Sequence, residues 1–131
     1  MDLTFDASPE TITRARRLLT VWLLRFGIHE AIDLTLAVSE LVTNAVRHGK
    51  PPIRLRVDCD ARRVRVEVHD HGGGRPAIRR AQKTGPASGG WGLQFVDRLA
   101  DRWGTYTTGD LTVVWLERAT GSLAGPAPPA R

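Results

Sequence analysis

Three polar side chains recur at helical spacing within the stretch LAVSELVTNAVRHG, residues 36–49: Glu40, Asn44 and His48. Positions four residues apart advance by about 40° beyond one full turn of an α-helix, so these side chains form one stripe. A carboxylate, an amide and an imidazole therefore border a core-facing surface. Such a stripe is either a solvated helix boundary or part of a binding site. The neighbouring apolar arc consists of Leu34, Val38, Leu41, Val42, Ala45 and Val46.

Glycines follow a second polar residue, Asp70, which ends an alternating apolar segment. Residues 72–74 are glycines, so the backbone beside this carboxylate has no side chains to block a ligand. A second glycine set, at 89–92, opens a helix near Trp91, and helix N-termini favour anions. The two sets flank one loop that could close over a bound molecule. These residues indicate a phosphate-bearing ligand between the helix carrying Glu40 and the helix near Trp91, although no Walker or Rossmann motif occurs.

The elements that must position these residues follow from periodicity and from helix-stop signals. We expect an α+β, two-layer sandwich with a mixed, mostly antiparallel sheet and helices on one face. The predicted elements are a strand at 3–5, a helix from Ser8 and Pro9 to Gly27, a helix from about 30 to His48, strands at 53–59 and 63–69, a helix from near Trp91 to Asp101, and strands at 103–108 and 111–118.

Length and composition indicate one domain, at residues 1–119, followed by a flexible tail rich in Pro, Ala and Gly at 120–131. The single cysteine, Cys59, rules out a disulfide framework and suits a reducing compartment. No apolar run reaches the roughly 18 residues that span a bilayer, and no secretion signal is recognisable. We therefore expect a cytoplasmic protein that does not bind membranes.

The formal net charge of +5 raises the alternative of a basic nucleic-acid-binding domain. Arginines in the predicted hairpin at 53–69 alternate with apolar residues, however, as on the outer face of a half-exposed hairpin. No aromatic residue interleaves with them, which disfavours a stacking platform for single strands. His69, His71 and Cys59 lack a recurring ligand spacing, so we predict no zinc site.

Four sequence segments resemble motifs of the GHKL ATPase superfamily. ELVTNAVRHG resembles the N-box, DHGGG the G1 box, GGWGLQFV the G2 box and LTVVWLE the final strand, in the family's order and spacing. The resemblance covers roughly residues 8–118. It is greatest to the bacterial anti-sigma factor serine/threonine kinases, because the ATPase domain stands alone. It implies the Bergerat ATP-binding fold.

The resemblance also implies roles for the polar residues. Asn44 would coordinate Mg²⁺ through its side-chain oxygen, and Glu40 would be the general base that takes a proton from the attacking hydroxyl. His48 completes the N-box and would support these residues. Asp70 would accept a hydrogen bond from the adenine amine, and Thr112 would help to hold the base.

The glycines of the G1 and G2 boxes would admit the nucleotide to the backbone. The resemblance implies contacts with ATP at Gly72, Gly74, Gly90, Gly92 and Leu93.

Between these boxes, the loop at 75–88 would act as a lid that is shorter than in the best-known relative. Its basic residues Arg79, Arg80 and Lys83 are candidates for contact with the γ-phosphate.

The implied activity is phosphorylation of an anti-sigma factor antagonist and sequestration of a sigma factor, without direct contact with nucleic acid. A homodimer is compatible with this interpretation. The same pocket would equally serve a non-catalytic ATP-binding module that acts by docking alone.

Overall fold

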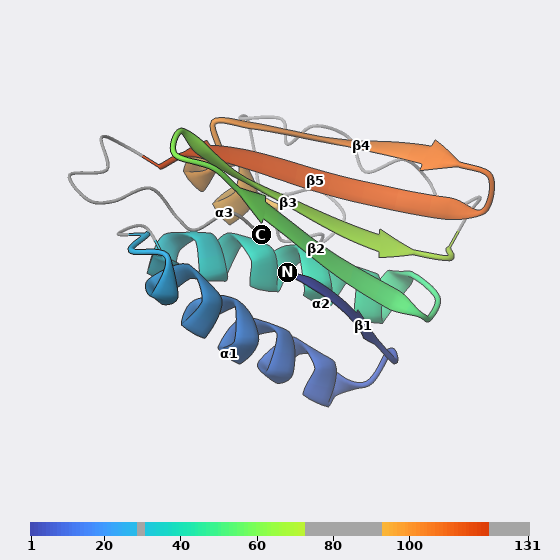
Figure 1. Ribbon diagram of the computed structural model, residues 1–131. Coiled ribbons are helices and arrows are strands. Elements are labelled where there is room, and N and C mark those ends of the chain that lie inside the picture. Colours follow the sequence, from blue (N-terminus) through green and yellow to red (C-terminus); the bar gives the residue numbers. More distant parts are fainter. Residues whose placement is uncertain (29–30, 73–92, 121–131) are drawn as a thin grey trace.

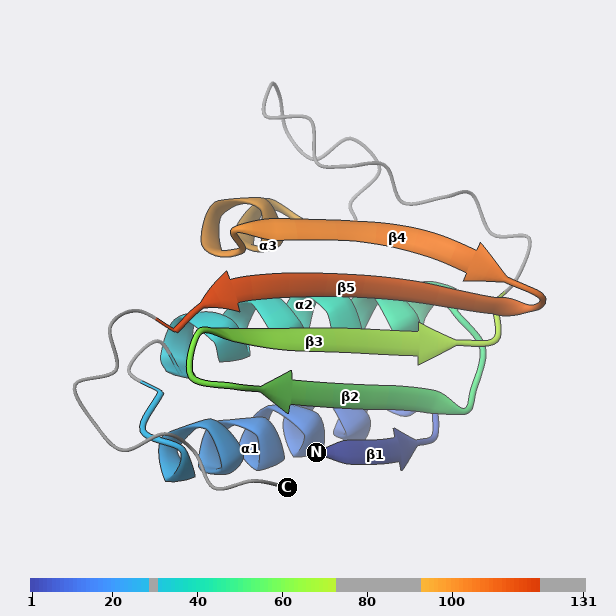
Figure 2. The same ribbon diagram turned by 45° about the horizontal axis from the view of Figure 1, so that its top comes forward.

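The computed structural model describes residues 1–28, 31–72 and 93–120. These residues form two layers, a five-stranded sheet and a layer of helices that covers one face of the sheet (Figures 1 and 2). The expected α+β sandwich is therefore confirmed. The elements are β1 (Asp2–Phe5), α1 (Pro9–Arg25), α2 (Ala31–His48), β2 (Ile53–Cys59), β3 (Arg63–Asp70), α3 (Gln94–Leu99), β4 (Arg102–Thr108) and β5 (Leu111–Ala119).

Helix α1 begins at Pro9, as predicted from the sequence, because the backbone of proline already has the φ angle of a first helical turn. Ser8 occupies the N-cap position as expected but makes no side-chain capping bond. Instead, the Ser8 hydroxyl donates to Asp6 Oδ1 at 2.8 Å, and the Thr11 hydroxyl donates to the Asp6 carbonyl at 2.8 Å. Asp6 therefore organises the entry into α1.

The strands lie in the order β1-β2-β3-β5-β4, and all four pairings are antiparallel. The sheet, expected to be mostly antiparallel, thus contains no parallel pair among the described strands. β3 lies at the centre and extends to Asp70, one residue beyond its predicted end. The register pairs Asp70 with Thr112 at the start of β5. Two residues predicted to contact a ligand are therefore neighbours across the sheet.

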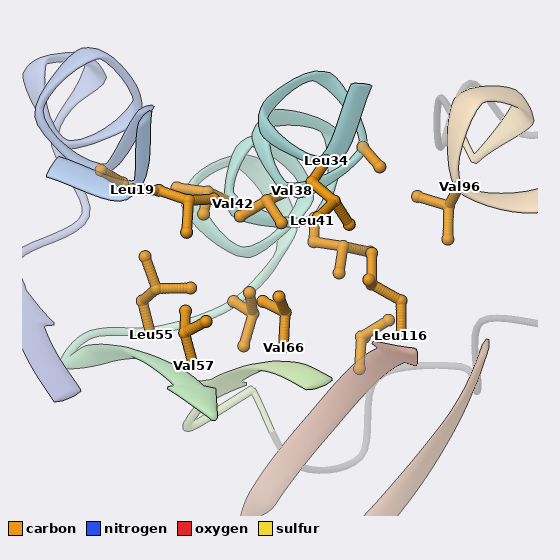
Figure 3. Packing of buried hydrophobic residues seen from close by; sticks show 14 of the residues in the cluster. Leu19, Leu34, Val38, Leu41, Val42, Leu55, Val57, Val66, Val96 and Leu116 are labelled. Atoms are coloured by element: carbon orange, nitrogen blue, oxygen red, sulfur yellow. The ribbon is translucent and has the colours of Figure 1, made fainter. Parts of the chain in front are cut away.

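The core fills the space between the two layers (Figure 3). Each helix contributes one apolar stripe, while every second residue of the inner strands points toward the helices. Burying one such leucine or valine side chain contributes about 1.5–3 kcal/mol before entropy is counted. The residues labelled between the layers are Leu19, Leu34, Val38, Leu41, Val42, Leu55, Val57, Val66, Val96 and Leu116.

Two predicted boundaries differ from the structure: the start of helix α3 and the start of the C-terminal tail. Helix α3 begins at Gln94, not near Trp91, and the preceding glycines lie outside the described residues. Thr120, the first residue of the expected tail, is buried, and its amide donates to the Arg62 carbonyl at 2.9 Å. The rest of that tail, 121–131, lies outside the described residues, as does the expected lid at 75–88.

No helix in the described part of the chain is long and apolar enough to cross a membrane.

Candidate functional site

Helix α2 carries the polar stripe predicted from the sequence, and its members differ strongly in exposure. Asn44 is only 4% exposed, Glu40 is half-buried and His48 is exposed. The middle residue of the stripe is therefore the most deeply buried, with a half-buried carboxylate one turn before it and an exposed imidazole one turn after it. A solvated boundary would not bury the amide so completely, so the arrangement favours a site over a simple helix edge.

The end of α2 meets the end of β3 at the Asp70 carboxylate, which is 1% exposed. The Gly72 amide donates to Asp70 Oδ1 at 2.7 Å, and the His71 amide donates to the Lys50 carbonyl at 2.9 Å. These bonds fix the carboxylate and join the segments that follow the helix and the strand. The site's walls are thus built from residues more than 20 positions apart in the sequence.

Gly49 provides the space in which this carboxylate lies. A Cβ atom at this position would be 2.6 Å from Asp70 Oδ1 and 2.7 Å from the Ala45 carbonyl oxygen. A Cβ at Gly72 would be 2.8 Å from Asp70 Oδ1 and 3.1 Å from the Gly49 Cα. Two glycines, one in the segment after α2 and one in the segment after β3, therefore leave room for one buried carboxylate.

Sequence reasoning identified Gly49 only as a helix stop and missed this packing role. Glycine usually ends helices because it adopts positive φ. Among the described glycines, however, only Gly27 and Gly109 have positive φ. Gly49 is thus required by close packing. Its place within the N-box motif was the one available signal, because periodicity carries no information about contacts across the fold.

Across the sheet from Asp70, Thr112 is 2% exposed and lies on the face that packs against the helices. Its hydroxyl has no hydrogen-bond partner, and neither has the buried Asn44 Nδ2. Buried polar groups in folded proteins are nearly always hydrogen-bonded, so exceptions call for an explanation such as a missing ligand. We refer to Asn44, Asp70 and Thr112 as the inner polar site.

Glu40 lies one turn before Asn44 on α2. Burial raises the pKa of its carboxyl group above the usual value of 4.5, while the charge of Arg47 acts in the opposite direction. A carboxylate with a raised pKa is a stronger base, which suits a group that takes up a proton.

The remaining predicted residues divide into three groups. Gly72 lies at the site, as described above. Leu93 is buried in the core cluster, so its side chain is a packing element and any contact with a ligand would have to use its backbone. Gly74, Gly90 and Gly92 lie outside the described residues, as do the basic candidates Arg79, Arg80 and Lys83.

The opposite face of the sheet carries a second polar group, which we call the outer charge cluster: Arg63, Arg65, Glu67, His69 and Glu117. Glu117 Oε2 lies 3.0 Å from Arg65 Nη1 and 3.2 Å from Arg63 Nη1. Glu67 accepts from Arg65 Nε at 3.0 Å and lies 3.0 Å from His69 Nε2. Every charge in this cluster has an opposite charge or a hydrogen-bonding group beside it.

An aromatic ring also contributes to this outer face. The Arg65 guanidinium lies 4.5 Å from the centre of the Trp115 ring, which in turn covers Gly104. The strand order brings this tryptophan beside the arginines, although none interleaves with them in the sequence. Within the described ranges, no group of three His, Cys, Asp or Glu side chains could hold a metal ion.

Comparisons with known proteins agree with this architecture. Residues 5–118 match the family described as the histidine kinase-like ATPase domain. Among solved structures, the chain is similar to the crystal structure of the RsbU and RsbW domains of Rv1364c from Mycobacterium tuberculosis, with a TM-score of 0.67 and 24% identity. That similarity covers 100% of this chain but 33% of the other, so this chain spans about a third of its length. A search of curated proteins gave no match.

The similarity to the solved structure concerns the fold. The family match covers nearly the whole described chain, including both strands and the helix that form the inner polar site. The chain belongs to the histidine kinase-like ATPase domain family.

Proposed function

We propose that this domain binds Mg²⁺-ATP at the inner polar site and acts as a serine/threonine kinase of the anti-sigma factor type. It would phosphorylate an anti-sigma factor antagonist and sequester a sigma factor. The observation that carries the proposal is the pair of buried, unpartnered polar groups, Asn44 Nδ2 on α2 and the hydroxyl of Thr112, which lies opposite the fixed Asp70 carboxylate in the sheet. A nucleotide would supply the missing hydrogen bonds.

The base would be recognised by Asp70 and Thr112. Asp70 already accepts the Gly72 amide on Oδ1, and a carboxylate has further lone pairs for a second donor. The exocyclic amine of adenine is such a donor, whereas guanine presents a carbonyl oxygen at the same position. The absence of side chains at Gly49 and Gly72 keeps this approach open.

Asn44 fits a role in holding the metal. Its unpartnered atom is Nδ2, and half a turn of the amide group would present the side-chain oxygen in the same place. Oxygen is the donor that Mg²⁺ prefers. When bound, Mg²⁺-ATP would supply the phosphoryl group and neutralise charge on its oxygens. His48, exposed at the end of α2, would support the N-box from the surface.

Glu40 would take the proton from the attacking hydroxyl of the substrate protein. Its half-buried position and raised pKa suit it to this role. Glu40 lies one helical turn from Asn44 on α2, so the proposed general base and the proposed metal ligand are on the same helix. Binding and chemistry would thus depend on different members of one stripe.

A nucleic-acid-binding role has less support. The arginines on the outer face of the hairpin are engaged with carboxylates, as in Arg54–Asp2 and Arg56–Asp58. Phosphate contacts would require those ion pairs to be exchanged. The partner we propose is therefore a protein.

The test combines calorimetric titration with Mg²⁺-ATP and incubation with γ-labelled ATP and a candidate antagonist protein. We expect saturable binding and transfer of label to a serine or threonine of the antagonist. Binding without transfer to any antagonist would favour the non-catalytic docking module. The absence of binding would contradict the proposal as a whole.

A further inference from the structure

A third buried hydroxyl remains without an assigned role. In the described part of the chain, three buried side-chain nitrogen or oxygen atoms lack a hydrogen-bond partner: Asn44 Nδ2, Thr112 Oγ1 and Thr105 Oγ1. The first two belong to the inner polar site. Since such atoms are rare in folded proteins, the third also calls for a ligand or a water molecule.

Thr105 lies in β4, directly opposite Val114 of β5, while Thr112 is opposite Thr107. Alternate residues of a strand share one face, so Thr105 and Thr112 lie on the same face of the sheet. Val114 belongs to the core cluster, which identifies this as the face that packs against the helices. Asp70 is on that face too, opposite Thr112.

Asp70, Thr112 and Thr105 therefore form one polar row across β3, β5 and β4. Diagonal positions on neighbouring antiparallel strands have Cα atoms about 7–8 Å apart, which suits two hydroxyls that share one small polar group between them. The two hydroxyls make no hydrogen bond with each other. One atom or one water molecule that contacts both would satisfy them together.

We propose that Thr105 helps to bind the adenine base by sharing with Thr112 one water molecule that donates a hydrogen bond to a ring nitrogen of the base. This inference rests on the proposed function, because it assigns the base to this end of the site. It extends base recognition beyond Asp70 and Thr112 to the edge strand. Thr105 acts on the base alone, so its contribution is independent of the γ-phosphate.

The test compares the wild-type protein with Thr105→Val, which keeps the side chain's shape and removes the hydroxyl. We expect the Kd for ATP and the Kd for ADP to rise by the same factor, about three- to tenfold. The melting temperature without nucleotide should stay equal or rise, because the variant no longer buries an unpartnered hydroxyl. Thr108→Val is the control, since Thr108 is exposed and alternates to the opposite face of the same strand.

A double variant tests the shared water. Thr105→Val combined with Thr112→Val should lose little more affinity than Thr112→Val alone, because either change removes the same bridge. Additive losses would overturn the shared contact. An unchanged Kd in Thr105→Val, or a loss confined to ATP, would overturn the role in base recognition while leaving the proposed function intact. Wild-type protein that binds neither nucleotide would overturn both.

Discussion

The two faces of the sheet carry polar groups of opposite character on the same strands, β3 and β5. On the outer face, Glu67 and Glu117 are almost fully engaged by the arginines and by His69. Thr112 on the inner face and Asn44 on α2 are more deeply buried, yet each has an unpartnered atom. Hydrogen bonding is thus least complete where burial is deepest, which is the pattern that we expect of a binding site and not of a structural cluster.

This contrast predicts how substitutions will divide. Changes in the outer charge cluster should alter the free energy of unfolding and leave nucleotide binding unchanged. Changes in the inner polar site should alter binding or phosphoryl transfer, with small effects on the stability of the nucleotide-free protein. The expected effects below run from the largest to the smallest.

The largest effect is expected at Glu40. Glu40→Gln retains the shape but cannot take up a proton, so phosphoryl transfer should slow by on the order of 10²–10⁴-fold while ATP affinity is largely kept. Single-turnover transfer at saturating ATP measures the rate, and Glu10→Gln, an exposed glutamate in α1, is the control. Transfer at the wild-type rate would show that Glu40 is not the base.

A matched pair of glycine substitutions tests the two faces directly. Gly49→Ala inserts a Cβ against Asp70 and the Ala45 carbonyl. Overpacking should lower the melting temperature, and displacement of the Asp70 carboxylate should weaken ATP binding about 10- to 100-fold. Gly104→Ala inserts a Cβ 3.1 Å from the Trp115 ring on the outer face. It should lower the melting temperature and leave ATP affinity unchanged. Titration calorimetry and thermal unfolding of both variants check this pattern. An unchanged ATP affinity in Gly49→Ala, or a weakened one in Gly104→Ala, would contradict the assignment of the two faces.

Asn44→Ala should weaken Mg²⁺-dependent ATP binding by about tenfold and slow transfer as a consequence, since the same residue would hold the metal. In the nucleotide-free protein the substitution removes no hydrogen bond at Nδ2, because that atom has no partner. Titrations with and without Mg²⁺ separate the two contributions. Equal losses under both conditions would count against a metal-binding role.

The smallest effect concerns the acid stability of the outer charge cluster. Burial raises the pKa of Glu67, but hydrogen bonds from His69 and Arg65 outweigh it and hold the pKa below the usual 4.5. The stabilisation is therefore complete above pH 4.5 and is lost as the pH falls through the lower pKa of the folded state. Urea unfolding at pH 6 and at pH 3 measures how far the free energy of unfolding falls with acid. In Glu67→Gln this fall should be smaller than in the wild type by about 1 kcal/mol. An unaltered pH dependence would mean that Glu67 is not a source of it.

Much of the fold could be predicted because it follows from local patterns. Pro9 and Gly27 marked the limits of α1, and alternation gave the strands of both hairpins to within about a residue. Helix α3 was placed too early because its expected start was inferred from glycines and not from apolar spacing. The hydrogen bonds that Asp6 accepts from the Ser8 and Thr11 hydroxyls were missed, since Ser8 satisfies the usual N-cap preference in sequence.

The candidate site was predictable only through the motifs. Periodicity placed Glu40 and Asn44 on one helix face, but it could not show that Asn44 is buried and Glu40 only partly so. The contact between Gly49 and Asp70 depends on how the ends of α2 and β3 meet, and Thr105 is recognisable only from the strand register. Such contacts join residues far apart in sequence, where local preferences carry no information.

The most direct test of the central claim is a calorimetric comparison of ATP and GTP binding to the wild-type protein and to Asp70→Asn, with Mg²⁺ present. Loss of a hydrogen bond to a charged group costs about 1.5–3 kcal/mol, so the account predicts that wild-type protein prefers ATP and that the variant binds ATP about 10- to 150-fold more weakly. Equal affinity of the wild-type protein for both nucleotides, or an Asp70→Asn variant that binds ATP as the wild type does, would contradict it.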